Sequence, residues 1–387
     1  MHVVIAPDSF SGTLTAAQAA QAIADGWART APDDLLTVLP LSDGGPGFLD
    51  VLSSHVEGEM VLTTVADPLS RPVPASILLA GTGGGVTAYV EAAQAVGLHL
   101  LDASERDPAR TTSYGVGQLL AVARAAGADR IVVGLGGAGT NDAGAGMLAA
   151  LGAGSDQVLG RGGRALREIL DDDLTGLAAV RADWAGAEIV AATDIGNPLL
   201  GLKGSSAVFA GRMGASPEVA QGLEDALGHF ADRAARALPS VTDLLVGAPR
   251  NLAREPGAGA GGGLGYGLFL LGGHRRSGVD LVLDAVDFGR LAAAADLVIT
   301  GEGCFDWQSL RGTVVSGVAR AALEVATPAL VIAGQVLVGR REAMGVGLSG
   351  VYAVAARPDQ EEAAFADPVG TLAARAARVA ATWSPQR

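Results

Sequence analysis

The sequence predicts an α/β protein of two domains, in which a domain built on a parallel sheet is interrupted by a second, mixed α/β domain. Three observations support this. The chain has 387 residues, whereas a single hydrophobic core stops growing at roughly 250–300 residues. Short β-branched runs alternate with Ala-rich amphipathic stretches, as in βαβ units. Residues 58–110 instead have alternating runs broken by prolines, which is typical of hairpins.

Six apolar runs along the chain have the length and composition of buried strands. They are residues 2–7, 36–41, 130–135, 188–193, 296–301 and 329–334. Residues 15–31, 113–127 and 316–326 lie between some of these runs and have the apolar periodicity of helices. Residues 156–280 lack this repetition. We therefore expect a first domain of residues 1–57, 111–155 and 281–387, with residues 58–110 and 156–280 forming the inserted domain.

The composition excludes several classes of partner. A formal net charge of −14 and a pI near 4.7 argue against nucleic acid and anionic membrane surfaces, which would be repelled. A single cysteine, Cys304, excludes an intramolecular disulfide and a cysteine-based metal cluster. The amino terminus lacks the pattern of a signal peptide, and the apolar run 257–273 is better interpreted as a buried Gly-rich turn feeding a helix than as a membrane span. We expect a cytoplasmic protein with small-molecule ligands.

Glycine-rich or acidic turns follow five of the predicted strands. They begin near residues 8, 42, 135, 194 and 302. Ligands of open α/β sheets bind at the carboxyl ends of the strands, where the amino termini of the following helices present free N–H groups. We expect the five turns to lie at one such edge and to form the ligand site.

The third turn, in the stretch "IVVGLGGAGTNDAGAGM" at residues 131–147, predicts a phosphate cradle. Its glycines match GxGxxG, but a dinucleotide fold needs a second strand ending in an acid about 20 residues further on, and residues 149–163 offer none. No P-loop motif GxxxxGK[ST] occurs in the chain. We expect backbone N–H groups of Gly136, Gly137, Gly139 and Thr140 to face phosphate, with side-chain donors from Thr140 and Asn141.

Six acids follow the strands and predict a cation. A carboxylate beside a phosphate cradle is repelled unless a cation mediates, which favours magnesium. The six are Asp8, Asp43, Asp142, Asp194, Glu302 and Asp306. The alternative for each is capping of the next helix, but several turns carry glycine where a helix start does not need it. Acids that converge on a Gly-lined site are typical of phosphoryl transfer.

Other reactive residues point to no second chemistry. The five histidines are scattered without metal-ligand spacing, so zinc is not expected. Cys304 has no histidine near it in the sequence and is interpreted as space-filling. The basic run at residues 273–278 could contact a nucleotide, but we interpret it as a solvated loop.

The motif blocks resemble those of the bacterial type I glycerate kinases, in the family's order and over nearly the whole chain. The blocks are "IAPDSFSGTLTA", "LPLSDGGPG", "GLGGAGTNDAGAGM", "TDIGNPLLG", "GAGAGGGLGYGL" and "VITGEGCFD", followed by "SLRG". The resemblance implies ATP-dependent phosphorylation of D-glycerate with Mg²⁺, giving 2-phosphoglycerate. It also implies a flavodoxin-like, Rossmann-like domain with a restriction-endonuclease-like domain inserted.

The resemblance extends to individual residues. Asp8, Ser9, Asp43, Gly44, Gly45, Thr140, Asn141, Asp142, Asp194, Asn197, Glu302 and Asp306 fall on family motif positions. We interpret Asp194, Asp43 and Asp8 as catalytic, with Asp194 or Asp43 orienting the glycerate hydroxyl as base. Glu302, Asp306 and Asp142 are expected to hold magnesium. The remaining positions, together with Arg311, are expected to bind substrate or nucleotide.

Several positions depart from the family pattern. Ser11 and Thr313 replace lysines, Cys304 replaces an arginine and Pro46 a glutamate; Ala138 and Phe305 differ as well. Three explanations stay open. Arg311, Lys203 or the basic run 274–276 supplies the missing charge; the substrate is another, less anionic hydroxy compound; or the chain is a non-catalytic relative that binds ligand. The retained acids favour an active kinase.

Overall fold

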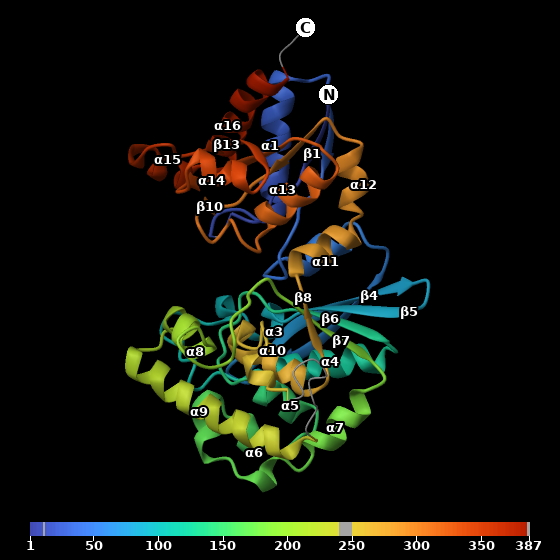
Figure 1. Cartoon of the computed structure of the whole chain (residues 1–387), viewed down its shortest axis with the longest axis vertical. Coiled ribbons are helices and arrows are strands. Elements are labelled where there is room, and N and C mark those ends of the chain that lie inside the picture. Colours follow the sequence, from blue (N-terminus) through green and yellow to red (C-terminus); the bar gives the residue numbers. More distant parts are fainter. Residues whose placement is uncertain (11, 240–249, 385–387) are drawn as a thin grey trace. The chain divides into compact units, whose positions relative to one another are not determined.

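The structure is a computed structural model that describes residues 1–10, 12–239 and 250–384 (Figure 1). The chain divides into two compact units. Unit 1 comprises Met1–Asp43, Asp50–Val56 and Ser277–Arg387, and unit 2 comprises Gly44–Leu49 and Glu57–Arg276. Each unit has its own sheet covered by helices, so the α/β class is confirmed.

Unit 1 is built on a five-stranded parallel sheet in the order β13-β11-β9-β1-β2. The strands are β1 (His2–Ile5), β2 (Leu35–Val38), β9 (Leu297–Thr300), β11 (Ala329–Ala333) and β13 (Leu348–Ala353). A short parallel pair joins β10 (Cys304–Phe305) to β12 (Gln335–Val336). The helices of this part of the chain are α1 (Ala16–Thr30), α11 (Gly278–Ala285), α12 (Phe288–Ala293), α13 (Val314–Glu324), α14 (Arg340–Gly345), α15 (Glu361–Ala366) and α16 (Pro368–Trp383), with a 3₁₀ turn at Pro358–Gln360.

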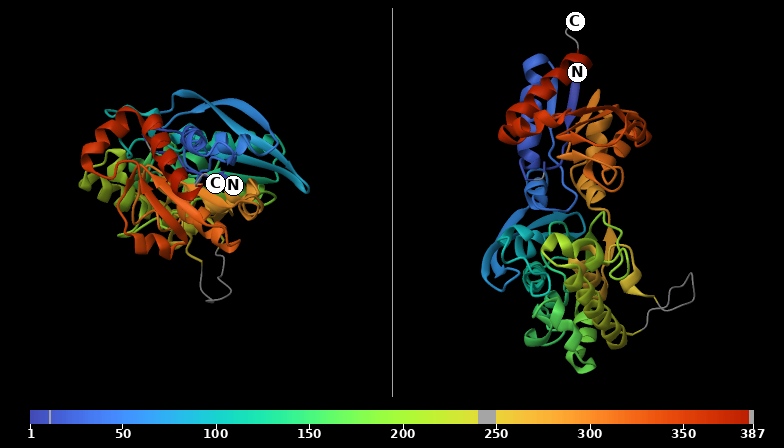
Figure 2. Two further views of the ribbon diagram at one scale, coloured as in Figure 1. Left: turned by 90° about the horizontal axis from the view of Figure 1, so that it is seen from above. Right: turned by 90° about the vertical axis from the view of Figure 1, so that its left-hand side faces the viewer.

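Helix α1 shows how the sequence sets its own boundaries. Thr15 accepts a hydrogen bond from Gln18 N at 3.2 Å, and the Gln18 side chain accepts one from Thr15 N at 2.9 Å. This capping box satisfies two donors that the helix itself leaves free. On the buried face, Trp27 packs into the core and donates from Nε1 to Asp34 at 2.8 Å. Helices α1 and α16 lie side by side (Figure 2).

Unit 2 contains a six-stranded mixed sheet in the order β3-β4-β5-β6-β7-β8. The strands are β3 (Glu59–Ala66), β4 (Pro72–Thr82), β5 (Gly85–Glu91), β6 (Arg130–Gly134), β7 (Glu188–Ala192) and β8 (His274–Arg276). β3, β4 and β5 pair antiparallel, and the pairings from β5 to β8 are parallel. The hairpins expected in residues 58–110 are confirmed.

The helices of unit 2 are mostly short. They are α3 (Ala93–Val96), α4 (Tyr114–Ala125), α5 (Ala145–Ala150), α6 (Asp156–Leu159), α7 (Leu177–Trp184), α8 (Ser205–Phe209), α9 (Pro217–Ala237) and α10 (Ala260–Leu270), with 3₁₀ turns at Leu98–Leu100, Gly163–Glu168, Asp171–Leu174, Ala210–Met213 and Leu252–Arg254. Helix α2 (Phe48–Ser53) contains residues of both units. Directly after Ala260, the first residue of α10, Gly261, Gly262 and Gly263 all have left-handed backbones, which confirms the expected Gly-rich turn. Among the helices in the described part of the chain, none is long and apolar enough to cross a bilayer.

Two expectations from the sequence are corrected. Residues 111–155 were expected in the first domain, yet β6 pairs with β5 and β7 and therefore lies in unit 2. The five polar turns do not share one edge: β1, β2 and β9 belong to the five-stranded sheet, whereas β6 and β7 belong to the six-stranded sheet. A βα repeat predicts the type of an element but does not specify the sheet that a strand joins.

Gly26 and Gly228 offer a paired test of the helix packing. A Cβ at Gly26 in α1 would lie 2.1 Å from the carbonyl oxygen of Ala373 on α16, so Gly26→Ala forces the helices apart. We expect this variant to lower the free energy of unfolding by about 1–3 kcal/mol. A Cβ at Gly228 in α9 meets only Leu200 Cδ1, at 3.9 Å, so Gly228→Ala should raise that free energy by about 0.5–1 kcal/mol. Chemical denaturation measures the two signs, and a shared sign would contradict the close contact.

Candidate active site

Three of the predicted acids meet in unit 1, at the carboxyl ends of three neighbouring strands. Strand β1 lies between β9 and β2, so Asp8 after β1, Asp43 after β2 and Glu302 after β9 share one edge of the sheet. Backbone hydrogen bonds tie these strand ends together: Asp8 N donates to Gly301 O at 2.8 Å, and Leu41 N donates to Pro7 O at 2.9 Å.

The acids at this edge repel one another in a poorly hydrated place. Burial raises the pKa of the Asp8 carboxyl to about 8, and the charges of Asp43 and Glu302 act in the same direction. The Ser9 N–H, 2.6 Å from Asp8 Oδ1, opposes this shift. Burial also raises the pKa of Glu302 to about 7, with Asp306 and Asp43 adding to the effect. A cation or a proton is needed to offset this repulsion.

Whether a magnesium ion fits here depends on which side-chain oxygens are not used by hydrogen bonds within the protein. Within the described ranges, no group of three or more histidine, cysteine or acidic residues is arranged to hold a metal by itself. However, Glu302 Oε1 and Thr300 Oγ1 are buried and have no hydrogen-bond partner among the described residues. Asp306 uses Oδ1 to accept from Gln308 N at 2.7 Å, which leaves Oδ2 for another ligand. Magnesium needs only one or two carboxylates when waters and phosphate oxygens complete its shell, so these residues fit it.

The positions that depart from the family pattern in unit 1 have local structural uses. The Thr313 hydroxyl donates to Ser309 O at 3.0 Å, and Thr313 N donates to Ser316 Oγ at 3.0 Å at the start of α13. Phe305 is buried, while Cys304 beside it is exposed. Partial burial raises the pKa of the Cys304 thiol, and Asp306 and Glu302 add to this, which disfavours a nucleophilic thiolate. Arg311 is exposed. Ser11 lies outside the described residues.

In unit 2, two glycine turns contact each other backbone to backbone. Gly136 N donates to Gly44 O at 3.1 Å. A Cβ at Gly136 would lie 2.4 Å from Gly45 Cα, and one at Gly44, where φ is +96°, would lie 3.0 Å from Ala192 O. A side chain at Gly136 would separate the turns, and one at Gly44 would be strained by its positive φ. Glycines that are expected to bind ligand are therefore also needed for the contact between the two turns.

The predicted phosphate cradle is smaller than expected. Gly136 N and Gly139 N are already used, the second donating to Val96 O at 2.7 Å. The N–H groups of Gly137 and Thr140 find no acceptor in the described part of the chain, and buried Thr140 Oγ1 likewise has no partner there. Gly137 and Thr140 therefore remain as donors for a ligand, whereas Gly139 serves the fold.

The prediction that Asp142 holds magnesium is corrected. Its carboxylate is fully buried and accepts from Ser113 N at 2.8 Å, Ser113 Oγ at 2.9 Å, Gly144 N at 3.1 Å and Gly146 N at 3.2 Å. Burial raises the pKa of this carboxyl, while these four hydrogen bonds oppose the shift. Donors of the protein occupy the oxygens that a metal would need, as in the capping alternative.

Asn141 and Asn197 also serve the backbone. Asn141 Nδ2 donates to Ser206 Oγ at 3.0 Å, and Asn141 Oδ1 accepts from Ser205 Oγ at 3.0 Å, so its amide ties the turn to α8. Asn197 Nδ2 donates to Lys203 O at 2.8 Å and closes the loop after β7. A residue at a family motif position can therefore have a structural role in holding a loop.

Arg275 is the residue that the sequence interpretation missed. The basic run was interpreted as a solvated loop, but His274–Arg276 forms strand β8 beside β7. Arg275 donates from Nε to Thr193 O at 3.0 Å and from Nη2 to Asp194 O at 3.2 Å, which fixes the turn that carries Asp194. Three residues are too few to show a strand period, and only the preceding Gly pair marks a boundary.

The chain was then compared with known proteins. Residues 3–384 match the model of the glycerate kinase family. This chain belongs to that family. A glycerate kinase of Bacillus subtilis (strain 168) is 40% identical over 341 residues, which cover 87% of this chain and 85% of that protein. Glycerate 2-kinase of Escherichia coli (strain K12) is 36% identical over 392 residues, which cover 99% of this chain and 98% of that protein.

A solved structure supports the same membership. The crystal structure described as glycerate kinase 2 from Salmonella typhimurium LT2 matches with a TM-score of 0.74 and 36% identity. The match covers 99% of this chain and 98% of that chain. The glycerate kinase family resemblance carried by the motif blocks is thus confirmed.

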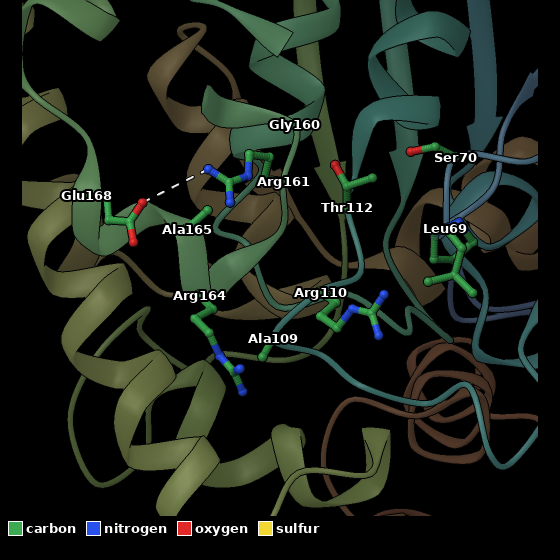
Figure 3. Close-up of a pocket in the computed structure, with 11 residues that line it drawn as sticks. Leu69, Ser70, Ala109, Arg110, Thr112, Gly160, Arg161, Arg164, Ala165 and Glu168 are labelled. Carbon is green, nitrogen blue, oxygen red and sulfur yellow. Dashed lines mark ion pairs between the residues drawn. The ribbon is translucent and has the colours of Figure 1, made fainter. Parts of the chain in front are cut away.

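One hollow in unit 2 of this glycerate kinase family member holds none of the predicted site residues. It has a volume of about 440 Å³, and Arg110, Arg161 and Arg164 line it. Arg161 pairs with Glu168 at 4.0 Å, and Figure 3 shows the guanidinium groups of Arg110 and Arg164 lying apart from Arg161 and from each other. Because the guanidinium groups do not converge on one point, we assign no ligand to this hollow.

Asp142→Asn separates a structural role from a metal role. The amide group turns an acceptor into a donor that faces N–H groups, so we expect the free energy of unfolding to fall by about 2–3 kcal/mol. The magnesium concentration needed for half-maximal activity should not change. Chemical denaturation and a magnesium titration measure the two effects. A large rise in that concentration at unchanged stability would return Asp142 to the metal ligands.

Proposed function

We propose that the protein transfers the γ-phosphoryl group of ATP to D-glycerate, with Mg²⁺ as cofactor and 2-phosphoglycerate as product. The observation that carries the proposal is the meeting of Asp8, Asp43 and Glu302 at one edge of the five-stranded sheet. Partly buried carboxylates that repel one another are stabilised by a cation, and phosphoryl transfer requires one. The names of the relatives from Bacillus subtilis and Escherichia coli supply the substrate.

Glu302 and Asp306 are the residues that we assign to magnesium. Glu302 Oε1 is buried without a partner in the described part of the chain, and Asp306 Oδ2 is not used by the turn that Oδ1 holds. The bound ion would neutralise charge on the transferring phosphoryl group. For this role, the carboxylate oxygens of Glu302 and Asp306 need to stay close together. The Ser309 N–H helps to fix Asp306 by donating to its Oδ1 at 3.3 Å.

Asp8 and Asp43 are assigned to the glycerate hydroxyl. A carboxylate at the end of β1 or β2 can orient the hydroxyl and accept its proton as the oxygen attacks phosphorus. Asp194 is the second candidate for this role, because Arg275 holds its turn in place. Ser9, next to Asp8, and exposed Arg311 are assigned to substrate or nucleotide contacts.

The glycine turns of unit 2 are assigned to the nucleotide phosphates. Gly44, Gly45, Gly136 and Gly137 let a ligand approach bare backbone, and Gly137 and Thr140 supply N–H donors. This assignment uses the donors that the fold leaves available.

The proposed reaction is tested by ADP release from the purified protein with ATP and Mg²⁺. D-glycerate should be turned over far better than L-glycerate or glycerol, because only D-glycerate presents both its hydroxyl and its carboxylate in the matching arrangement. Nuclear magnetic resonance of the product should show phosphate on the 2-hydroxyl. Turnover of glycerol in place of glycerate would move the substrate to a neutral hydroxy compound, and silence on every acceptor with ATP still bound would reject a kinase.

The carboxylate roles are tested by Asp8→Asn and Glu302→Gln, with Asp33→Asn as control. We expect each of the first two to cut turnover by about a hundredfold or more. Glu302→Gln should also raise the magnesium concentration for half-maximal activity, whereas Asp8→Asn should not. Asp33 is an exposed acid of the same unit and its variant should behave like the parent. Near-normal turnover of either test variant would remove that residue from the site.

A further inference from the structure

Glu91 is a buried acid that the proposed reaction has not used. It ends β5 and lies opposite Gly134 in the register with β6, at the point where the turn that contains Gly136 begins. Only 5% of the residue is exposed. Burying a carboxylate costs free energy unless hydrogen bonds satisfy it, so the donors that bind Glu91 indicate its role.

The Glu91 carboxylate holds the turn between Gly44 and α2. Oε1 accepts from Gly47 N at 3.1 Å, and Oε2 accepts from Leu49 N at 3.1 Å. These N–H groups lie at the start of α2, where a helix provides no acceptor of its own. An acid more than forty positions away in the chain therefore caps this helix.

The other side of the same turn is fixed by the second glycine turn. Gly44 O accepts from Gly136 N at 3.1 Å, and a Cβ at Gly137 would lie 2.7 Å from Pro46 Cγ. Gly44 and Gly47 both have left-handed backbones, with φ of 96° and 91°. Two such glycines make a turn with many alternative conformations, so it needs fixed points at both ends to keep a single shape.

We infer that Glu91 is a positioning residue for phosphate binding: it holds residues 44–47 in the conformation that the nucleotide requires. The inference rests on the proposed function, which assigns Gly44 and Gly45 to the nucleotide phosphates. Both carboxylate oxygens are needed, because each accepts from a different N–H. A glutamine in this place would turn an NH₂ group toward one of the two donors, and that end of the turn would come loose.

Three variants test the inference by hydrogen exchange and kinetics. In Glu91→Gln, we expect the amides of Gly47 and Leu49 to exchange about tenfold faster or more, because a charge-assisted hydrogen bond is lost. The KM for ATP should rise, and kcat/KM should fall by about a hundredfold, as displaced binding groups cause. Glu91→Asp keeps the charge but is shorter, so it should give intermediate values.

Asp67→Asn is the matched control in unit 2. Asp67 is 4% exposed and accepts from Leu69 N and Arg71 N, both at 2.8 Å, in the turn between β3 and β4. It is a buried acid that holds a different turn. Its variant should speed exchange at Leu69 and Arg71 and leave the KM for ATP unchanged.

The outcomes are distinct. Two results for Glu91→Gln would overturn the positioning role and leave the proposed reaction intact. One is unchanged hydrogen exchange at Gly47 and Leu49. The other is faster exchange there with an unchanged KM for ATP, as expected for the Asp67→Asn control. If the parent protein does not phosphorylate D-glycerate, the proposed function fails instead. The inference is then decided by the Kd for ATP in the same variants, which should rise with the exchange rate if Glu91 positions the turn.

Discussion

The main constraint on unit 1 is that its parallel sheet holds like charges close together at one edge. Burial and mutual repulsion raise the pKa values of Asp8 and Glu302 toward neutrality. Such an arrangement lowers stability unless a ligand compensates, so the fold holds the acids in place rather than being held by them. The strands position the acids, because β9, β1 and β2 are adjacent and hydrogen bonds just beyond the strand ends fix the backbone that carries them.

In unit 2 the corresponding constraint is backbone contact without side chains. The turns at Gly44 and Gly136 approach so closely that a Cβ on Gly136 would lie 2.4 Å from Gly45 Cα. Beside this contact, the N–H groups of Gly137 and Thr140 have no acceptor in the described part of the chain. The polar residues around the turns, Asp142 and Asn141, are then occupied with holding this backbone. One glycine pattern therefore fixes the loops and also supplies the backbone donors that we propose for phosphate binding.

Much of the fold could be predicted from the sequence, because burial and periodicity are local signals. The six apolar runs all became strands, and the proline-broken segment became the hairpins of β3, β4 and β5. The sheet to which β6 belongs could not be predicted, since pairing is decided by partners distant in the chain. The roles of Asp142 and Arg275 were missed for a related reason. A carboxylate beside glycines has the same sequence signature whether it accepts four protein donors or binds a cation.

The loss of positive charge at Cys304 and Thr313 bears on how the site would balance its anions. Thr313 lies at the start of α13, where its N–H donates to Ser316 Oγ, and Cys304 is a thiol whose pKa is raised by burial, so neither contributes a cation. Arg275 is occupied with two carbonyls of the turn after β7. With fewer cationic side chains near the acids, the divalent ion would have to offset more of the charge of ATP and substrate. A kinase of this composition should therefore depend strictly on magnesium, because its acids repel phosphate whenever the ion is absent.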